Sequence, residues 1–118
     1  MREIVLYRTA SGRCPVQDFL DDLTAAQLKR VAEALGIVAT ADPVSPQLLK
    51  KLSGTEDLWE VRVQHAGNAF RILGFWDGGR MIVLVSAFAK KTGKTPLLEL
   101  EVAQRRRRDY LSRKGHHG

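Results

Sequence analysis

The sequence has a single cysteine, Cys14, and few residues of the kinds that mark a secreted or metal-binding protein. One cysteine excludes an internal disulfide, a cysteine-rich metal site and a CxxC redox pair. The three histidines, His65, His116 and His117, show no ligand spacing such as HExxH, so we expect no metal and no cofactor. A reducing cytoplasm is the compartment that best fits this cysteine usage.

Long apolar runs are also missing. The longest stretch covers residues 81–89, is interrupted by Ser86 and is far too short to span a bilayer. The N-terminus opens with a charge pair and a short apolar run, so it lacks the apolar core of a secretory signal. We therefore expect a soluble protein with no membrane partner. Its length predicts one domain over residues 1–118, with a loose tail from about residue 113.

The net charge of +6 is concentrated at one end of the chain. Residues 1–89 hold ten basic and ten acidic residues, whereas residues 90–118 hold nine basic and three acidic ones. A localised basic segment attracts a polyanion, and nucleic acid is the most common polyanion that such segments bind. An anionic membrane and an acidic protein are the alternative partners.

Turn residues divide the first half of the chain into short elements. The composition predicts a strand at 3–8, and Pro15 followed by apolar residues at helical spacing predicts a helix at 15–23. Thr24 and Gln27 form a capping box that opens a second helix, so the two helices make a hairpin. A further helical turn or two is predicted at 46–52.

The second half changes from helical to alternating spacing. Three strands are predicted at 58–65, 68–76 and 81–90, and a helix is predicted from Thr95-Pro96 to about Ser112. If both strand connections are two-residue turns, Arg62 lies opposite Arg71, and Arg71 lies opposite Ser86. The face expected to pack on the helices carries Trp59, Val61, Val63, Phe70, Ile72, Trp76, Met81, Val83, Val85 and Ala87. The opposite face carries Glu60, Arg62, Gln64, Arg71, Leu73, Phe75, Leu84, Ser86, Phe88 and Lys90.

The Arg62–Arg71 pair has two interpretations. Opposed arginines repel unless an anion or a carboxylate lies between them, and Glu60 is a candidate for a structural ion pair. Alternatively, the two guanidinium groups grip a phosphate and neutralise the charge that grows during phosphoryl transfer. Lys90 points to the same side of the predicted sheet.

Three further features have both a structural and a functional interpretation. The segment KKTGKTP at 90–96 is either a solvated loop or an anion site at a helix N-terminus, and it lacks the spacing of a Walker loop. Phe88 either covers exposed sheet or stacks on a base. The arginine run at 105–108 either complements the helix dipole or holds an RNA backbone.

Three segments together resemble the phage-derived branch of the RelE/HigB toxin superfamily: LWEVR at 58–62, FRI at 70–72 and FAKKTGKTP at 88–96. The resemblance covers nearly the whole chain. It implies an α+β RelE-like fold, in which a small antiparallel-rich sheet packs on an N-terminal helical hairpin and a C-terminal helix follows. It also implies a type II toxin that cleaves messenger RNA on the ribosome, beside ribosomal RNA, and is neutralised by a small antitoxin, often a helix-turn-helix protein.

By this resemblance the catalytic positions are Arg62, Arg71 and Lys90. The positions expected to bind messenger or ribosomal RNA are Phe88, Lys91, Lys94, Arg105 and Arg106. Related sequences often place a histidine where this chain has Ser86, so an obvious acid/base group is missing.

The implied reaction is a metal-independent attack of the ribose 2′-hydroxyl on the adjacent phosphorus. Arg62 and Arg71 would neutralise the transition state, and Lys90, with a pKa lowered by neighbouring cations, would act as the base. Two alternatives remain open: a ParE-like inhibitor of DNA gyrase, and an inactive module that binds nucleic acid or an antitoxin. The 90–96 segment favours the ribonuclease over the gyrase inhibitor.

Overall fold

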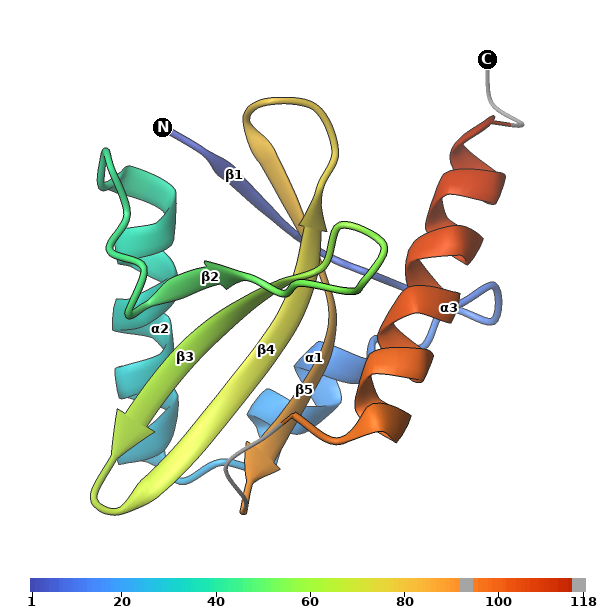
Figure 1. Cartoon of the computed structure of the whole chain (residues 1–118). Coiled ribbons are helices and arrows are strands. Elements are labelled where there is room, and N and C mark those ends of the chain that lie inside the picture. The colour runs from blue at the N-terminus through green and yellow to red at the C-terminus, as the bar shows by residue number, and fades with distance from the viewer. Residues whose placement is uncertain (92–94, 116–118) are drawn as a thin grey trace.

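The computed structural model describes residues 1–91 and 95–115, which form a sheet with helices on both faces. The elements in chain order are β1 (Glu3–Leu6), α1 (Pro15–Asp21), α2 (Ala25–Thr40), β2 (Leu49–Lys51), β3 (Trp59–His65), β4 (Asn68–Trp76), β5 (Met81–Lys90) and α3 (Leu97–Gly115). The five strands have the order β1-β5-β4-β3-β2; β1 runs parallel to β5 and the other pairs are antiparallel. α1 and α2 cover one face and α3 covers the other (Figure 1).

This arrangement confirms the predicted α+β architecture and is compatible with a RelE-like fold. The bounds of β4 and β5 agree with the prediction. The capping box is also present, since the Gln27 N–H donates to Thr24 Oγ1 (3.2 Å) and the Thr24 N–H donates to Gln27 Oε1 (3.0 Å). Local patterns therefore located most elements correctly.

The prediction of helix at 46–52 is wrong for its second half. The chain makes a turn after Ser45 and then forms β2, in which Leu49 pairs with Val61 and Lys51 pairs with Trp59. An apolar pattern this short fits either type of element, so pairing with a strand distant in sequence decides it. At the other end, α3 continues to Gly115, beyond its predicted end, and residues 116–118 lie outside the described part.

The first hairpin has the predicted register. Arg62 lies directly opposite Arg71 across β3 and β4. The turn between these strands consists of Ala66 and Gly67, which both have positive φ (49° and 83°). Positive φ at both central residues is the geometry of a two-residue type I′ turn, whose twist matches that of the paired strands.

The second hairpin has a different register from the predicted one. Arg71 lies opposite Phe88, so the predicted pairing of Arg71 with Ser86 is wrong. One cause is the turn, in which the Asp77 N–H donates to Met81 O (2.8 Å) and closes a longer loop than the two-residue turn that was expected.

The other cause is a β-bulge. Leu73 pairs with Ser86 but Gly74 pairs with Leu84, so Val85 is an extra residue in β5. A bulge inserts one residue into one strand and exchanges the faces of the residues on either side. Sequence periodicity contains no sign of such an insertion.

The bulge changes which core the residues of β5 enter. Met81, Val83 and Val85 pack in the apolar cluster under α3, and Ile82 and Leu84 pack in the cluster under α1 and α2. The predicted placements of Met81, Val83, Val85 and Leu84 are therefore wrong. Because α3 covers part of the face that was expected to be solvated, both faces of the sheet contribute to a core.

Polar contacts fix α3 to the rest of the molecule along most of its length. The Tyr7 hydroxyl donates to Asp109 (2.6 Å) and the Tyr110 hydroxyl donates to Asp77 (2.8 Å). Arg108 forms an ion pair with Glu56 in the loop before β3.

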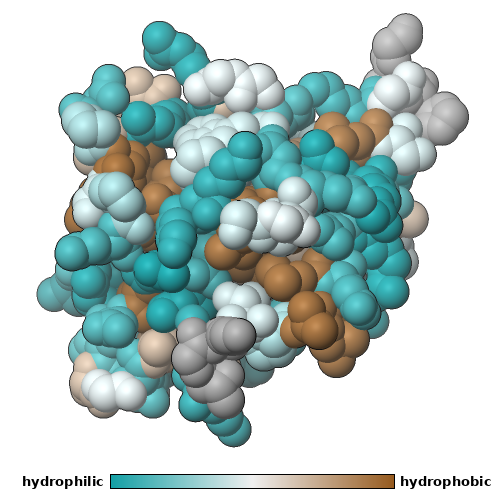
Figure 2. Space-filling model, in the orientation of Figure 1, coloured by the Kyte–Doolittle hydropathy of each residue, from teal (hydrophilic) through white to brown (hydrophobic). Residues whose placement is uncertain are grey.

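The face shown in Figure 2 is largely hydrophilic, and hydrophobic side chains gather where α3 begins. Of the helices within the described residues, none is both long and apolar enough to cross a membrane.

Candidate functional site

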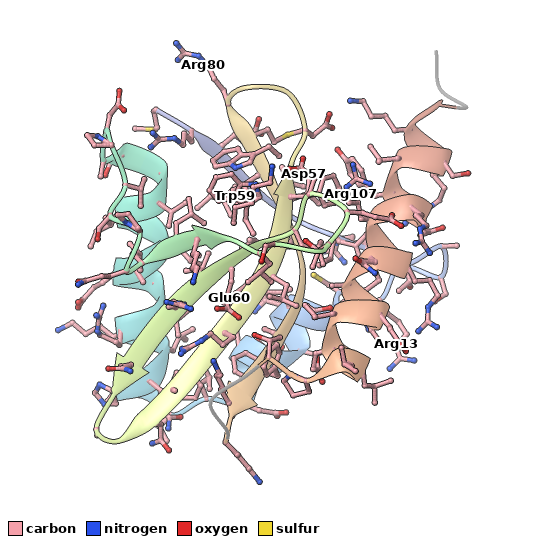
Figure 3. The ribbon with its side chains drawn as sticks, viewed as in Figure 1. Arg13, Asp57, Trp59, Glu60, Arg80 and Arg107 are labelled. Carbon is pink, nitrogen blue, oxygen red and sulfur yellow. The ribbon has the colours of Figure 1, made fainter. Side chains whose placement is uncertain are left out.

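A buried carboxylate, Glu60, lies on the face of the sheet that carries α3 (Figure 3). Its side chain is 1% exposed. Oε1 lies 3.0 Å from Arg62 Nε and 3.6 Å from Arg71 Nε, and Oε2 accepts a hydrogen bond from the Thr95 hydroxyl (2.6 Å). Glu60 therefore joins two neighbouring strands to the segment that leads into α3.

The register of β3 and β4 places the two arginines side by side. Arg71 is the more buried of the pair, with a side chain 10% exposed against 32% for Arg62. Arg71 Nη1 donates to the Phe70 carbonyl (3.1 Å). Burial lowers the pKa of Arg71, the positive charge of Arg62 lowers it further, and Glu60 opposes this change. Arg62 is thus the arginine that a ligand reaches more easily.

Lys90, at the end of β5, belongs to the same cluster. Burial lowers the pKa of Lys90, and the charges of Arg71, Arg62 and Lys50 lower it further, whereas Glu60 raises it. These four cationic side chains around Glu60, namely Arg62, Arg71, Lys90 and Lys50, are called the cationic cluster below. The three residues predicted to be catalytic therefore gather around Glu60, although Arg71 is buried there.

A groove of about 520 Å³ opens over this cluster beside β2, and we call it the β2 groove. It runs between β2, the centre of the sheet and the start of α3. Its lining residues are Lys50, Lys51, Leu52, Ser53, Thr55, Glu60, Arg62, Lys90, Thr95 and Leu100.

Lys50 and Thr95 were not identified as site residues from the sequence. Lys50 was missed because its segment was predicted to be helical, whereas in β2 it pairs with Glu60 and lines the groove. Thr95 was identified only as the start of a helix and as part of the candidate anion site at 90–96, without a role of its own. The available signal was the pair of lysines seven residues before LWEVR, but this signal has meaning only once β2 is recognised as a strand.

The remaining predicted residues are more scattered. Phe88 is half-buried opposite Arg71 and packs against the cluster under α3. Lys91 is exposed at the end of β5, Arg105 is exposed on α3, and Lys94 lies outside the described residues.

Arg106 has a structural contact. Its Nη1 donates to the Val85 carbonyl and to Ser86 Oγ, both at 2.9 Å. It lines a separate pocket with Thr9 and Arg13. Ser86, where related sequences often have a histidine, is buried at the bulge. Its hydroxyl is engaged by the hydrogen bond from Arg106.

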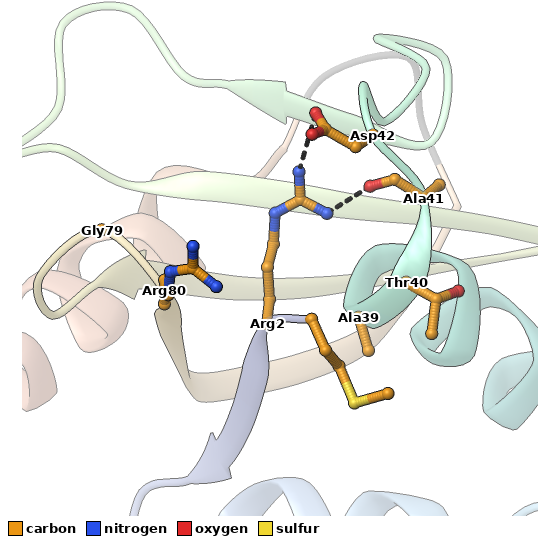
Figure 4. Close-up of a pocket in the computed structure, with 8 residues that line it drawn as sticks. Arg2, Ala39, Thr40, Ala41, Asp42, Gly79 and Arg80 are labelled. Atoms are coloured by element: carbon orange, nitrogen blue, oxygen red, sulfur yellow. Dashed lines mark hydrogen bonds and ion pairs between the residues drawn. The ribbon is translucent and has the colours of Figure 1, made fainter.

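A further pocket, at the other end of the sheet, is formed around Arg2 (Figure 4). The Arg2 guanidinium donates to the carbonyls of Val38 and Ala41 and pairs with Asp42 (3.6 Å). A cation at this position stabilises the C-terminal end of α2, where backbone carbonyls lack helical partners. Within residues 1–91 and 95–115, no group of three or more His, Cys, Asp or Glu side chains is placed to hold a metal ion.

The fold and the cationic cluster define an α+β protein, compatible with a RelE-like architecture, that has a cationic face. A family model described as phage derived protein Gp49-like (DUF891) matches residues 18–108. The chain therefore belongs to this family, which is part of the RelE/ParE toxin-like superfamily. Membership of a phage-derived, toxin-like family points to an antitoxin as partner. No curated protein matches the chain.

Proposed function

We propose that the protein is the toxin of a type II toxin–antitoxin system and acts in the cytoplasm as a ribosome-dependent endoribonuclease. The observation that carries this proposal is the shared use of one carboxylate. Arg62 and Arg71 both contact Glu60 Oε1, while Lys90 and Lys50 line the same groove as Glu60. Four cations surround one anion at an open groove, so a phosphodiester would supply the missing negative charge.

The structural ion pair anticipated from the sequence is present, and it supports the functional interpretation. A guanidinium held by a buried carboxylate keeps its position before a ligand arrives. Preorganised cations stabilise developing charge more effectively than mobile ones, since they need no reorganisation during the reaction. Glu60 thereby orients Arg62 toward the groove without neutralising the whole cluster.

Each step of the proposed cleavage has a candidate residue. Lys90 takes the proton from the ribose 2′-hydroxyl, because its lowered pKa raises the fraction of the side chain that is a neutral amine. The 2′-oxygen attacks phosphorus, and the bond from phosphorus to the 5′-oxygen breaks. The leaving oxygen receives a proton from Lys50 on the other side of the groove. Arg62 and Arg71 neutralise the phosphorane-like transition state.

The other predicted residues have supporting roles in this proposal. Phe88, beside Arg71, stacks on a base of the messenger. Lys91, Lys94 and Arg105 contact phosphates of messenger or ribosomal RNA. The chain acts as one domain, and an antitoxin of helix-turn-helix type neutralises it.

Induced expression in growing cells tests this proposal. We expect growth arrest together with new messenger RNA ends that carry 5′-hydroxyl groups, found by sequencing RNA ends soon after induction. The same ends should appear on purified translating ribosomes and not on messenger RNA alone. Breaks in DNA with intact messengers would instead identify a gyrase inhibitor, and normal growth would identify a binding module.

A further inference from the structure

Among the described residues, no strand pairs with the outer edge of β3 beyond the end of β2. β2 pairs with β3 as far as Val61, and the last contact is the hydrogen bond from the Arg62 N–H to the Leu48 carbonyl (2.8 Å). A second groove, of about 550 Å³, lies along this edge and reaches α2, which stands beside β3 in Figure 1. We call it the edge groove. Its lining residues are Arg30, Ile37, Ser45, Gln47, Leu48, Arg62, Gln64 and Arg71.

The edge groove meets the β2 groove at Arg62. Arg62 lines both of them, and Arg71, whose Nε lies near Glu60, lines the edge groove. A polymer whose phosphate lies on Arg62 therefore has a groove on either side of it. Since successive phosphates of a nucleic acid are joined by one sugar, the neighbouring nucleotide lies within reach of these two grooves.

The lining of the edge groove combines the three kinds of group that bind a nucleotide. Its charged residues, Arg30, Arg62 and Arg71, are all cationic. Ile37 is 45% exposed and lies two turns after Arg30 on α2, so it offers an apolar surface to a base.

The amide side chains complete this set. Gln47 and Gln64 are both exposed in the groove. An amide offers donors and an acceptor together, and such groups read the edge of an unstacked base.

We propose that the edge groove binds the nucleotide next to the scissile phosphate, with Arg30 on its phosphate and with Gln47 and Gln64 reading its base. The inference rests on the proposed function for the position of the scissile phosphate on Arg62. It assigns a substrate-binding role to α2 and makes the two glutamines the residues that determine sequence preference.

Binding of a single-stranded 2′-O-methyl RNA oligonucleotide tests the role of Arg30, since this probe lacks the attacking hydroxyl. Arg30→Ala should weaken binding about fivefold in fluorescence anisotropy. It should also reduce the slope of log affinity against log salt by about 0.7, the value for one lost phosphate contact on a single strand. Lys29→Ala removes the same charge from the neighbouring exposed position and should change neither quantity.

Sequencing of messenger RNA ends tests the two glutamines. Gln47→Ala and Gln64→Ala should leave cleavage active but relax the nucleotide preference at one position beside the cut. Thermal unfolding followed by circular dichroism checks that each variant folds. The assignment would be overturned if Arg30→Ala bound the oligonucleotide with wild-type affinity and salt slope. It would also be overturned if both glutamine variants cleaved at the same sequences as the wild type.

The outcomes separate this inference from the proposed function. If the wild type produces no new messenger ends but binds the oligonucleotide in an Arg30-dependent way, cleavage is wrong and the groove stands as an RNA site. If cleavage occurs and all three variants behave like the wild type, the groove assignment alone is wrong. Loss of antitoxin binding in Arg30→Ala with unchanged RNA binding would assign the groove to the antitoxin.

Discussion

Arg62 and Arg71 face each other across β3 and β4 and share one oxygen of Glu60, at 3.0 and 3.6 Å from their Nε atoms. Two guanidinium groups this close repel, and Glu60 offsets that repulsion. The two arginines and Glu60 together retain more positive than negative charge. An anion bound at this place would therefore also stabilise the sheet.

Removal of Arg62 should separate activity from folding. We expect Arg62→Ala to reduce cleavage on translating ribosomes by about 10² to 10³-fold, the effect of losing one preorganised donor to the transition state. Its unfolding midpoint in urea should stay close to that of the wild type, because Glu60 keeps Arg71 and Thr95 as partners.

Arg80→Ala is the matched control. It removes an arginine from the turn between β4 and β5, away from Glu60 (Figure 3), and should leave cleavage unchanged. A fully active Arg62→Ala variant would contradict the proposed role of Arg62.

Replacement of the buried carboxylate, in contrast to the removal of Arg62, should lower the stability of the protein. Glu60→Gln keeps the shape of the side chain but leaves the buried Arg71 opposite Arg62 without a counter-charge. Loss of one partner of a buried pair costs about 3–5 kcal/mol of unfolding free energy, which urea denaturation measures. The double variant Glu60→Gln/Arg71→Met should recover part of this loss, since no buried charge remains. Equal stability of the single and double variants would show that the pair does not act as a unit.

The pH dependence of cleavage should report on Lys90. Because burial and nearby cations lower its pKa, the neutral base becomes available at lower pH than for an ordinary lysine. The single-turnover rate should rise with pH up to this lowered pKa and then level off. Lys90→Arg keeps the charge but cannot act as a base, so the rate should be lost across the range while RNA binding remains. An unchanged pH profile in Lys90→Arg would exclude Lys90 as the base.

The contact of Tyr110 with Asp77 should make the protein sensitive to alkaline pH. Burial, followed by the hydrogen bond to Asp77, raises the pKa of Tyr110 to about 12. The folded state then keeps a proton that the unfolded chain releases at the ordinary tyrosine pKa. This part of the stability is fully present below that ordinary pKa and is lost as pH rises toward 12. Tyr110→Phe should show a smaller alkaline loss in urea unfolding experiments, and an equal loss in both proteins would contradict this assignment.

The bulge should require a glycine at position 74. A Cβ built on Gly74 would lie 2.6 Å from the Val83 carbonyl oxygen, so backbone must move to accept it. We expect Gly74→Ala to lower the unfolding free energy by about 1–3 kcal/mol. Gly36→Ala on α2 is the control; a Cβ there meets nothing within 4 Å, so helix propensity should raise stability by up to about 1 kcal/mol. The experiment is thermal or urea unfolding of both variants, and equal effects would contradict the steric explanation.

Features that depend only on neighbouring residues follow from the sequence alone. Thr24 and Gln27 form a capping box because they are three residues apart. Ala66-Gly67 adopts a two-residue turn, and this turn alone fixes the pairing of Arg62 with Arg71. The core of the candidate site was therefore predictable, since alternation along a strand then places these side chains on one face.

Features that depend on residues far apart in the chain follow only from the tertiary fold. β2 exists because β3 offers it a partner, and only this pairing brings Lys50 to Glu60. The bulge at Gly74, added to the longer turn, places Phe88 rather than Ser86 opposite Arg71. The edge groove forms where β2 stops and α2 stands alongside. None of these has a local signal, because each depends on which segments meet when two faces of one sheet are covered by helices.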